Sequence, residues 1–559
     1  MMFELTQTTS ARTLGLAAAS ILALLAGTAS AQNSGAVTGM SMKAAQVDDK
    51  PAGESAAIPG KLTAAQRDKA EAILAKSIEF MRARQHSSGG WGVREQGPTF
   101  PAITSLVVLG FVDGPIGGAT TIPTTDPAMQ KALDFLLSKQ REDGGIFDQI
   151  LPSYNTAISL SAVTRYPDQR ARDAAVKALA FLRTLQWAED KANQADMTDA
   201  AKAVGKEDPF YGGVGYGRHG RPDLSNTAFF VEALKDAGVE KDDPAFTRAL
   251  VFLQRTQMLA AGEGTSANQA TPANQATPGN DMAYAKGSTQ GGFIYATSVN
   301  KDRVGVGQSN AGDIAESLSG PAGTVVTIAL GKGLDGKPKL MTKDEVQAAM
   351  RKIAKSLESW PVARSNDEVI GNDAVVLLGA TADNLAANTF EVRTPIQDAA
   401  EIAKAVEAEF TGATVEAKSV SAWMGESRLR AYGSMTYAGF KSLVYAGLSQ
   451  DDPRVLAAKS WIEANYTVTE NPSLGTDGYF YYLVAFSKAL EAAKMDVVKT
   501  RGVEDSAVVA RAWRVDLIDE LAKHQNADGS FRPVDDRWME TDLELITAYC
   551  MIALQHALR

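Results

Sequence analysis

The sequence predicts an all-α fold with a small α/β insertion, arranged as an (α/α)6 toroid of inner and outer helices. Two alternating series of helical segments lead to this prediction. Segments of the first series begin with Asp-Pro, at Asp126, Asp243 and Asp452. Segments of the second series are more apolar and include "AITSLVVLGF", "YNTAISLSAV", "SNTAFFVEAL" and "ELITAYCMIAL". Self-similar segments that recur along a chain are the signature of a repeat architecture.

Each Asp-Pro segment carries the local signals of a helix start. The Asp side chain caps the N-terminus, and Pro in the first turn loses no hydrogen bond because its missing N–H would lack an intrahelical partner. Charged positions leave these helices one face for solvent, whereas the apolar series is expected to be buried all round. Six outer and six inner helices close most simply into a ring. A linear solenoid of helix pairs is the alternative.

The ends of the outer segments also repeat. The stretches "RARQHSSGGWG", "LSKQREDGGIF" and "LAKHQNADGSF" each place a Gln a few residues before Gly and then an aromatic residue or Ile. Glycine adopts the left-handed conformation that tight turns after a helix require. We therefore expect a common turn after each of these helices.

One interval interrupts the repeat. Between Gln257 and Tyr466 the chain holds a low-complexity loop and then segments that read, in order, β-α-β-β-α-β. This order predicts a ferredoxin-like βαββαβ domain inserted at residues 322–421. The toroid is accordingly predicted over residues 61–321 and 422–559.

The N-terminal residues have the pattern of a targeting segment. Arg12 precedes the apolar run "LGLAAASILALLAG", and small residues follow it. This predicts a Sec-type signal peptide over residues 1–31, with a retained signal anchor as the alternative. Residues 32–60, rich in Ala, Gly, Ser and Pro, are predicted to be a disordered leader. We expect a periplasmic or secreted protein with no transmembrane segment after signal removal.

Composition narrows the possible partners. The 559 residues carry a net charge of −10, and no basic patch with interleaved aromatic residues is present. Phosphate backbones are bound by clustered Lys and Arg, so no nucleic-acid partner is expected. Cys550 is the only cysteine, which excludes an internal disulfide.

The motifs "YGGVGYG", "RPDLSNT", "LRAYGSMTYAGFKSLVYAG" and "DRWMETDLELITAY", together with the Gln–Gly–aromatic repeats, carry a resemblance. The chain resembles the squalene-cyclase / protein-prenyltransferase superfamily over nearly all of residues 62–559 except the insertion. Within it, the chain is similar to bacterial exported prenyltransferase/squalene-oxidase repeat proteins. The resemblance implies a toroid whose central cavity takes a hydrophobic polyisoprenoid-type ligand.

The chain departs from both catalytic patterns of that superfamily. Class II cyclases protonate their substrate with the central Asp of D-x-D-D-T-A. The corresponding segment here keeps Asp223 but has Ser225 and Asn226 at the next two acidic positions. Prenyltransferases bind Zn²⁺ through Asp, Cys and His, whereas Cys550 and His556 are six residues apart and lie on different faces of a helix. We expect no metal and no cofactor, and the sequence leaves open whether the protein is an enzyme; if it is, it would be a non-standard cyclase-like isomerase or lyase.

Candidate ligand-binding residues come from the inner helices and from the start of the "YGSMTY" segment. They are Asp223, Asn226, Phe230, Arg428, Arg430, Tyr432, Ser434, Tyr437, Tyr481, Tyr482 and Tyr549. The aromatic members either line a pocket or pack in a filled core. The two Arg residues either bind an anion at a helix N-terminus or form an ordinary salt-bridged loop. Asp223 with Asn226 fits a helix cap better than a catalytic group.

A second candidate site is acidic, and it lies near the last inner helix. Its members are Asp535, Asp536, Asp542 and Glu544. Such a cluster either binds a cation, supplies an acid, or forms a solvated loop. The predicted function is that of an exported terpenoid-cyclase/prenyltransferase-like toroid that binds, or also transforms, a polyisoprenoid-type ligand. The alternatives are a non-catalytic scaffold that binds an envelope protein through the inserted domain, and a toroid that cleaves polysaccharide.

Overall fold

The computed structural model describes residues 60–93, 97–189, 203–217, 221–261, 278–298, 304–310, 323–333, 336–356, 375–378, 386–394, 399–420, 429–501 and 508–559. The predicted signal peptide, the predicted leader up to residue 59, and Arg428 lie outside these ranges. Within them the chain is mostly helical with small sheets, which confirms the predicted class of a helical protein with a small β-containing insertion.

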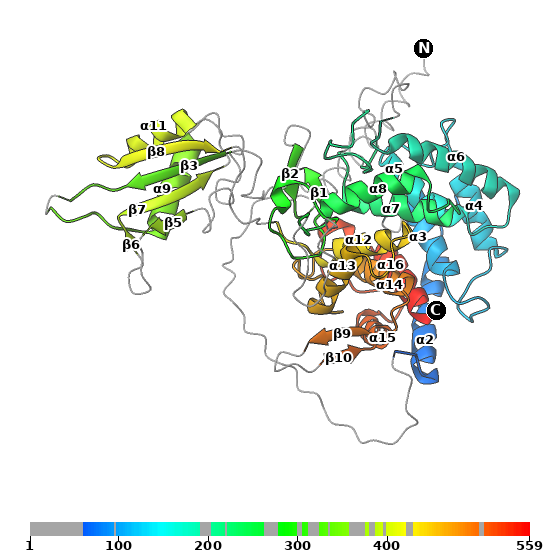
Figure 1. The fold of residues 1–559 in the computed structure, drawn as a ribbon. Helices are drawn as coiled ribbons and strands as arrows, with labels where there is room; N and C mark the ends of the chain where they lie inside the picture. Colours follow the sequence, from blue (N-terminus) through cyan, green and yellow to red (C-terminus); the bar gives the residue numbers. More distant parts are fainter. Residues whose placement is uncertain are drawn as a thin grey trace, which may run out of the picture.

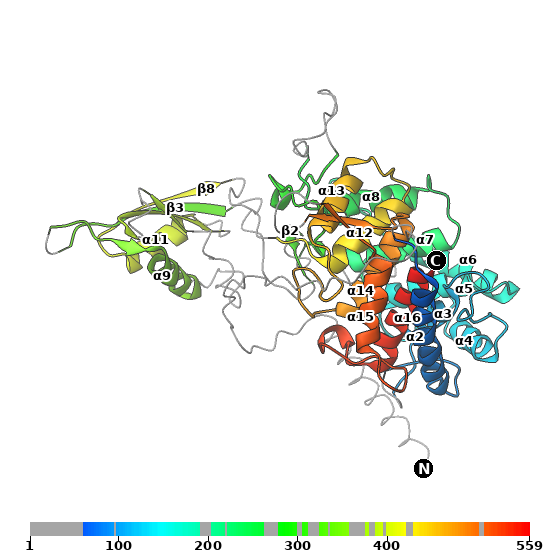
Figure 2. The ribbon, with the colours of Figure 1, turned by 90° about the horizontal axis from the view of Figure 1, so that it is seen from below.

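Among the described residues, six apolar helices pack around a common centre (Figures 1 and 2). They are α3 (Pro101–Val112), α5 (Pro152–Val163), α7 (Leu224–Asp236), α12 (Gly433–Tyr445), α14 (Tyr479–Ala492) and α16 (Leu543–Leu558). Each packs against the next in this order, and α16 packs against α3, so that the cycle of contacts closes. Helix α16 is buried on every side, because every residue from Glu544 to Leu558 is buried and only its first residue, Leu543, is half-buried.

A second set of helices covers the first on the outside. It comprises α2 (Ala64–Ala83), α4 (Pro127–Ser138), α6 (Gln169–Leu185), α8 (Pro244–Thr256), α13 (Pro453–Ala464) and α15 (Trp513–His524). Each packs on an inner helix: α4 on α3, α6 on α5, α8 on α7, α13 on α12, and both α15 and α2 on α16. In α4 only one stripe of side chains is buried, as expected for a helix with one solvent face.

The Asp-Pro segments begin helices for the predicted reason. The carboxylate of Asp126 accepts the backbone N–H of Ala128 at 2.9 Å, and Pro127 is the first helical residue of α4. Asp243 and Asp452 cap α8 and α13 in the same way. Asp126 also forms an ion pair with Arg82 of the preceding outer helix at 2.7 Å. The same residue therefore starts one helix and joins it to its neighbour.

The repeated Gln joins each outer helix to the next. The Nε2 of Gln140, after α4, donates to the carbonyl of Gly144 at 3.1 Å and to that of Ala174 in α6 at 2.9 Å. The corresponding bonds recur at Gln85, Gln186, Gln257 and Gln525. Gln525, after α15, reaches the carbonyl of Ile73 in α2 at 2.8 Å and so links the last outer helix to the first. At the remaining junction the Tyr466 hydroxyl donates to Asp516 of α15 at 2.7 Å.

The insertion forms a separate sheet with helices on one side (Figure 2). Its elements are β3 (Gly323–Ala329), α9 (Lys343–Ser356), β5 (Val375–Leu378), β7 (Thr389–Thr394), α11 (Ala399–Glu409) and β8 (Thr414–Val420). The strand order is β8-β3-β7-β5, and every neighbouring pair is antiparallel. Its buried residues, among them Val326, Val346, Phe390 and Ile402, form a core distinct from that of the helical body.

Short strands complete the described structure. They are β1 (Ala296–Ser298) with β2 (Val304–Gln308), β4 (Met341–Thr342) with β6 (Ala386–Ala387), and β9 (Val498–Arg501) with β10 (Val508–Arg511). Short 3-10 turns, η1 (Ala283–Ala285) and η3 (Arg537–Met539), lie in loops. None of the helices in the described ranges combines the length and the apolarity that crossing a membrane requires.

Candidate functional site

The N-terminal ends of the inner helices surround a cavity of about 130 Å³. All six inner helices contribute to its lining, through residues such as Ala102 of α3, Tyr154 of α5, Ser225 of α7, Met435 of α12 and Leu545 of α16. Residues that precede five of these helices also line it: Phe100, Leu151, Tyr216, Tyr432 and Trp538. The site is thus a product of the helix packing as a whole.

Four aromatic rings from different helices form the deep wall of the cavity. Tyr154 meets Phe229 edge-on, with ring centroids 5.3 Å apart, and Phe229 lies 6.2 Å from Tyr481. Tyr481 in turn lies 6.1 Å from Tyr549. The hydroxyl of Tyr481 is 3.1 Å from the Oγ of Ser225. Burial raises the pKa of Tyr481, so this wall carries no negative charge at neutral pH.

Two loops with left-handed residues also line the cavity, one before α5 and the other before α16. Leu151, Trp538 and Met539 all line the cavity, and all have left-handed backbones, with φ of 53°, 53° and 67°. Each such residue costs roughly 1–3 kcal/mol, and residues of this kind gather at functional sites. Gly478 allows the loop before α16 to approach α14, because a Cβ at this position would lie 2.6 Å from the Trp538 ring.

The loop before α16 also places a buried acid at the cavity. Glu540 follows the strained pair and is only 1% exposed. Its two carboxyl oxygens accept the backbone N–H groups of Phe480, at 3.0 Å, and Tyr481, at 2.8 Å, in the first turn of α14. Burial raises the pKa of Glu540 to about 8, and outweighs the opposite effect of these N–H groups. Glu540 is therefore mostly protonated at pH 7.

The raised pKa of Glu540 has a measurable effect on stability. Since the folded protein keeps a proton that the unfolded chain releases above its ordinary pKa of 4.5, stability is lost as the pH rises from about 5 to 8. We expect this carboxyl to contribute a decrease in the free energy of unfolding of about 1.4 kcal/mol per pH unit. Glu540→Gln, which resembles the protonated acid, should remove that slope in urea unfolding followed by circular dichroism. The exposed acid Glu470, changed to Gln, should leave it, and an unchanged slope in Glu540→Gln would contradict the assignment.

Some of the sequence candidates lie at this cavity. Tyr432, Ser434, Tyr481 and Tyr549 line it. Tyr432 is the residue before α12, and the backbone N–H of Ser434 donates to the Oδ1 of Asn471 at 2.9 Å, which holds the start of that helix. The structure thus brings together candidates from three inner helices.

Other candidates do not line the cavity. Asp223 is buried and accepts the backbone N–H of Asn226 at 2.9 Å and its side-chain amide at 2.8 Å, so this pair caps α7. Burial raises the pKa of Asp223 to about 6, although the hydrogen bonds from Asn226 act to lower it. The rings of Phe230, Tyr437 and Tyr482 are packed in the helical core. Arg430 is exposed and donates to the carbonyl of Leu429, and Arg428 lies outside the described residues.

The four acidic candidates lie in separate environments. Asp535 accepts the hydroxyl of Thr476 at 3.0 Å, and Asp536 is exposed. Asp542 caps α16 through the backbone N–H of Leu545, and Glu544 is buried and accepts the backbone N–H of Gly92 at 3.1 Å. Among the described residues no group of three His, Cys, Asp or Glu side chains is placed to hold a metal ion.

Reasoning from the sequence missed several residues of the cavity. Tyr216 and Tyr295 belong to loops before or between helices, as do Trp538 and Glu540. A usable signal was present: "RWMET" precedes an apolar helix and contains both an aromatic residue and an acid. The acid that lines the cavity is Glu540, which directly follows Trp538 and Met539. The left-handed backbones of these two residues cannot be seen in the sequence.

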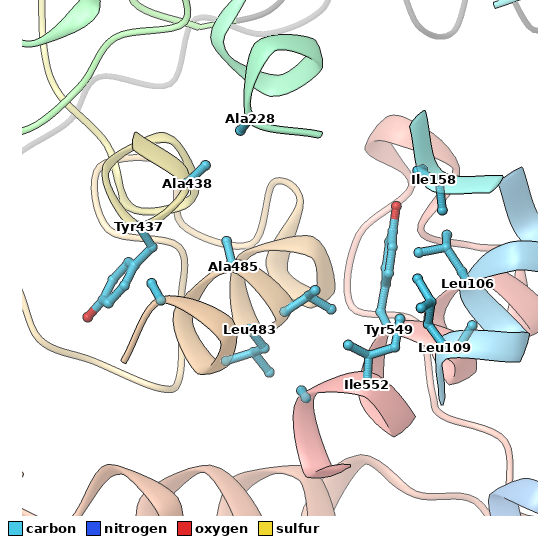
Figure 3. Packing of buried hydrophobic residues seen from close by; sticks show 14 of the residues in the cluster. Leu106, Leu109, Ile158, Ala228, Tyr437, Ala438, Leu483, Ala485, Tyr549 and Ile552 are labelled. Carbon is cyan, nitrogen blue, oxygen red and sulfur yellow. The ribbon is translucent and has the colours of Figure 1, made fainter. Parts of the chain in front are cut away.

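Below the aromatic wall, the centre of the ring narrows and holds a buried ion network. A space of about 20 Å³ is lined by Ala228, Ala438 and Ala485, which face one another from α7, α12 and α14 (Figure 3). Three charged residues also border it. The carboxylate of Glu232 pairs with the ammonium groups of Lys441 and, at 2.6 Å, Lys488. Burial alone would raise the pKa of Glu232, but the two lysines lower it well below its usual value.

Comparison with known proteins gives a partial match. No protein-family model matches the chain. A stretch of 135 residues, 22% of this chain, is 27% identical to squalene–hopene cyclase of Zymomonas mobilis. That stretch spans 20% of the relative's length. The match is distant and partial, and it points to the cyclase superfamily, in agreement with the sequence motifs.

Proposed function

We propose that the protein is an exported α/α toroid related to the terpenoid cyclases, and that its cavity binds the branched end of a hydrophobic, isoprenoid-type ligand. The closed cycle of inner helices and the partial match to a squalene–hopene cyclase support the architecture. The strand order of the insertion supports a ferredoxin-like domain. The signal-peptide pattern of residues 1–31 supports export to the periplasm or beyond.

The observation that carries the ligand class is the lining of the cavity. Nine of its lining residues are aromatic, and Leu, Ile, Met and Ala supply most of the rest. An engineered apolar cavity of about 150 Å³ holds one benzene molecule. A cavity of about 130 Å³ therefore has room for a branched group of five to seven heavy atoms, the size of one isoprene unit. A longer ligand would place the remainder of its chain outside.

Cyclisation of a whole thirty-carbon chain does not fit this geometry. Such a substrate needs roughly five times the volume of a six-carbon ring. Its protonation also needs a strongly acidic group, whereas the raised pKa of Glu540 makes it a weak acid. Ser225, which the sequence resemblance aligns with the cyclase donor, carries only a hydroxyl. We therefore place the function in ligand binding.

Filling the cavity tests this function. Ser225→Phe adds a ring to the lining between Tyr481 and Phe229, and it is expected to weaken binding of 3-methylbut-2-en-1-ol at least tenfold in calorimetric titration. Ser225→Ala removes the hydroxyl without filling space and is expected to bind as the original protein does. Equal binding by the two variants would place the ligand elsewhere, and no binding by the original protein would refute the proposal.

A second substitution tests the exclusion of cyclase chemistry. Ser225→Asp places a carboxyl at the position that the sequence resemblance aligns with the cyclase donor, and it does not enlarge the cavity. We expect no cyclised product when this variant is incubated with squalene and the products are analysed by gas chromatography and mass spectrometry. Detectable cyclisation would show that the cavity opens to accept the full substrate.

A further inference from the structure

Glu540 and the aromatic wall face the same small cavity, and together they indicate the charge of what binds there. We propose that the group held in the cavity is a small organic cation, such as a substituted ammonium, with its charge against the aromatic rings and the Glu540 carboxylate. This rests on the proposed function, because it specifies the end of the ligand that enters the cavity.

The first support is the composition of the lining. Of the described residues that line the cavity, Glu540 has the one carboxyl group, and none is Lys, Arg or His. A cation within about 6 Å of an aromatic ring is attracted by the negative face of the ring, and the attraction is strongest where water is excluded. Tyr154, Phe229, Tyr481 and Tyr549 provide such rings from four helices.

The second support is the remaining capacity of the carboxylate. A carboxylate accepts about four hydrogen bonds or close cation contacts, and Glu540 uses two of these positions for the N–H groups of α14. Helix N-termini repel cations, but carboxylates offset this effect at three of them. Glu540 lies at the start of α14, Asp223 caps α7 and Asp542 caps α16.

The third support is the protonation state without ligand. An uncompensated carboxylate in this apolar surrounding takes up a proton, which is why the pKa of Glu540 is about 8. An entering cation would favour the charged carboxylate and release that proton. Among the described residues, titratable groups that interact with Glu540 include Asp535 of the same loop, Tyr479 of α14, and Tyr549 and Cys550 of α16. Burial raises the pKa of the last three, so they stay protonated between pH 7 and 9.

Asp223 is also close to the site, near Tyr432 and Tyr481. Its pKa of about 6 means that it is mostly ionised throughout the range from pH 7 to 9. Over this range a pH dependence of binding therefore reports on Glu540. The ionised fraction of an acid with a pKa near 8 rises about tenfold from pH 7 to pH 9.

A pair of probes of equal shape tests the proposal on the full chain. Choline and 3,3-dimethylbutan-1-ol differ in one central atom and in charge. In calorimetric titration at pH 9 we expect choline to bind at least tenfold more tightly than the alcohol. At pH 7 the affinity for choline should be about tenfold lower, and its binding should release close to one proton from Glu540. The affinity for the alcohol should not change with pH.

Variants separate the contribution of the carboxylate from that of the rings. Glu540→Gln should lose the preference for choline and its pH dependence while it still binds the alcohol, and the exposed change Glu470→Gln should have no effect. If Glu540→Gln does not fold, as judged by circular dichroism, Tyr481→Leu should still weaken choline more than the alcohol. Binding of the alcohol without a preference for choline would overturn this proposal alone. Binding of neither probe would overturn the proposed function as well.

Discussion

Replacing Glu232 with Gln is expected to lower the free energy of unfolding by about 3–5 kcal/mol, because it leaves two buried lysines without their shared partner. The carboxylate of Glu232 is the charge that both ammonium groups contact, at the centre of the ring. Removing one partner of a buried ion pair costs far more than the intact pair contributes, since the remaining charge stays out of water. Here two charges of the same sign would remain, and they would also repel each other.

The opposite substitution provides the matched control. Lys441→Met removes one ammonium group and leaves Glu232 paired with Lys488, which is electrically neutral. Met also replaces the methylene chain of Lys441 with an apolar side chain of similar length. We therefore expect the free energy of unfolding to fall by about 1 kcal/mol or less. Chemical denaturation of both variants at pH 7 checks the asymmetry. Equal losses would show that the charge balance of the triad does not determine its stability.

Substituting Ala for Gly212 is expected to cost roughly 3 kcal/mol, because two effects add. Gly212 has φ of 82°, a conformation that costs an Ala residue about 1–2 kcal/mol. In addition, a Cβ at this position would overlap the carbonyl oxygen of Arg248 in α8. Relieving the overlap would move the turn off the outer helix, at a further cost of about 1–3 kcal/mol.

Gly117 separates these two effects. It has a similar φ of 74°, but no atom lies within 4 Å of the position of its missing Cβ. Gly117→Ala should therefore cost only the conformational part, about 1 kcal/mol. Thermal and urea unfolding of the two variants give the comparison. Similar losses would mean that the close approach of the turn to α8 contributes nothing beyond the backbone conformation.

Local signals made the helical framework predictable from the sequence. Asp126, Asp243 and Asp452 cap their helices through atoms two residues away, so the sequence contains the whole interaction. The alternation of amphipathic and apolar segments likewise indicated that the apolar segments form the inner helices and the amphipathic segments the outer ones. The predicted strand order of the insertion depended on the order of its segments alone.

The site was harder to predict because it depends on helix rotation and on loop backbones. Neighbouring residues of a helix point about 100° apart, so Phe229 lines the cavity while Phe230 lies in the core, and Tyr481 and Tyr482 divide in the same way. Glu540 becomes a cavity acid only because Trp538 and Met539 adopt left-handed backbones and because α14, about 60 residues earlier, supplies its N–H partners. Neither condition is visible in the letters around position 540.

The hydrogen bond from Gln525 to Ile73 joins residues that are 452 positions apart in the chain. In a chain that leaves the ribosome or crosses a membrane N-terminus first, one side of α2 therefore stays uncovered until the last two helices, α15 and α16, pack against it. Contacts of such long range form slowly, because bringing the distant segments together carries the full entropy of closing the loop. Nascent or truncated forms would expose the apolar side of α2 until then. Docking of the final 50 or so residues would therefore complete assembly, and the chain would depend most on a chaperone before that step.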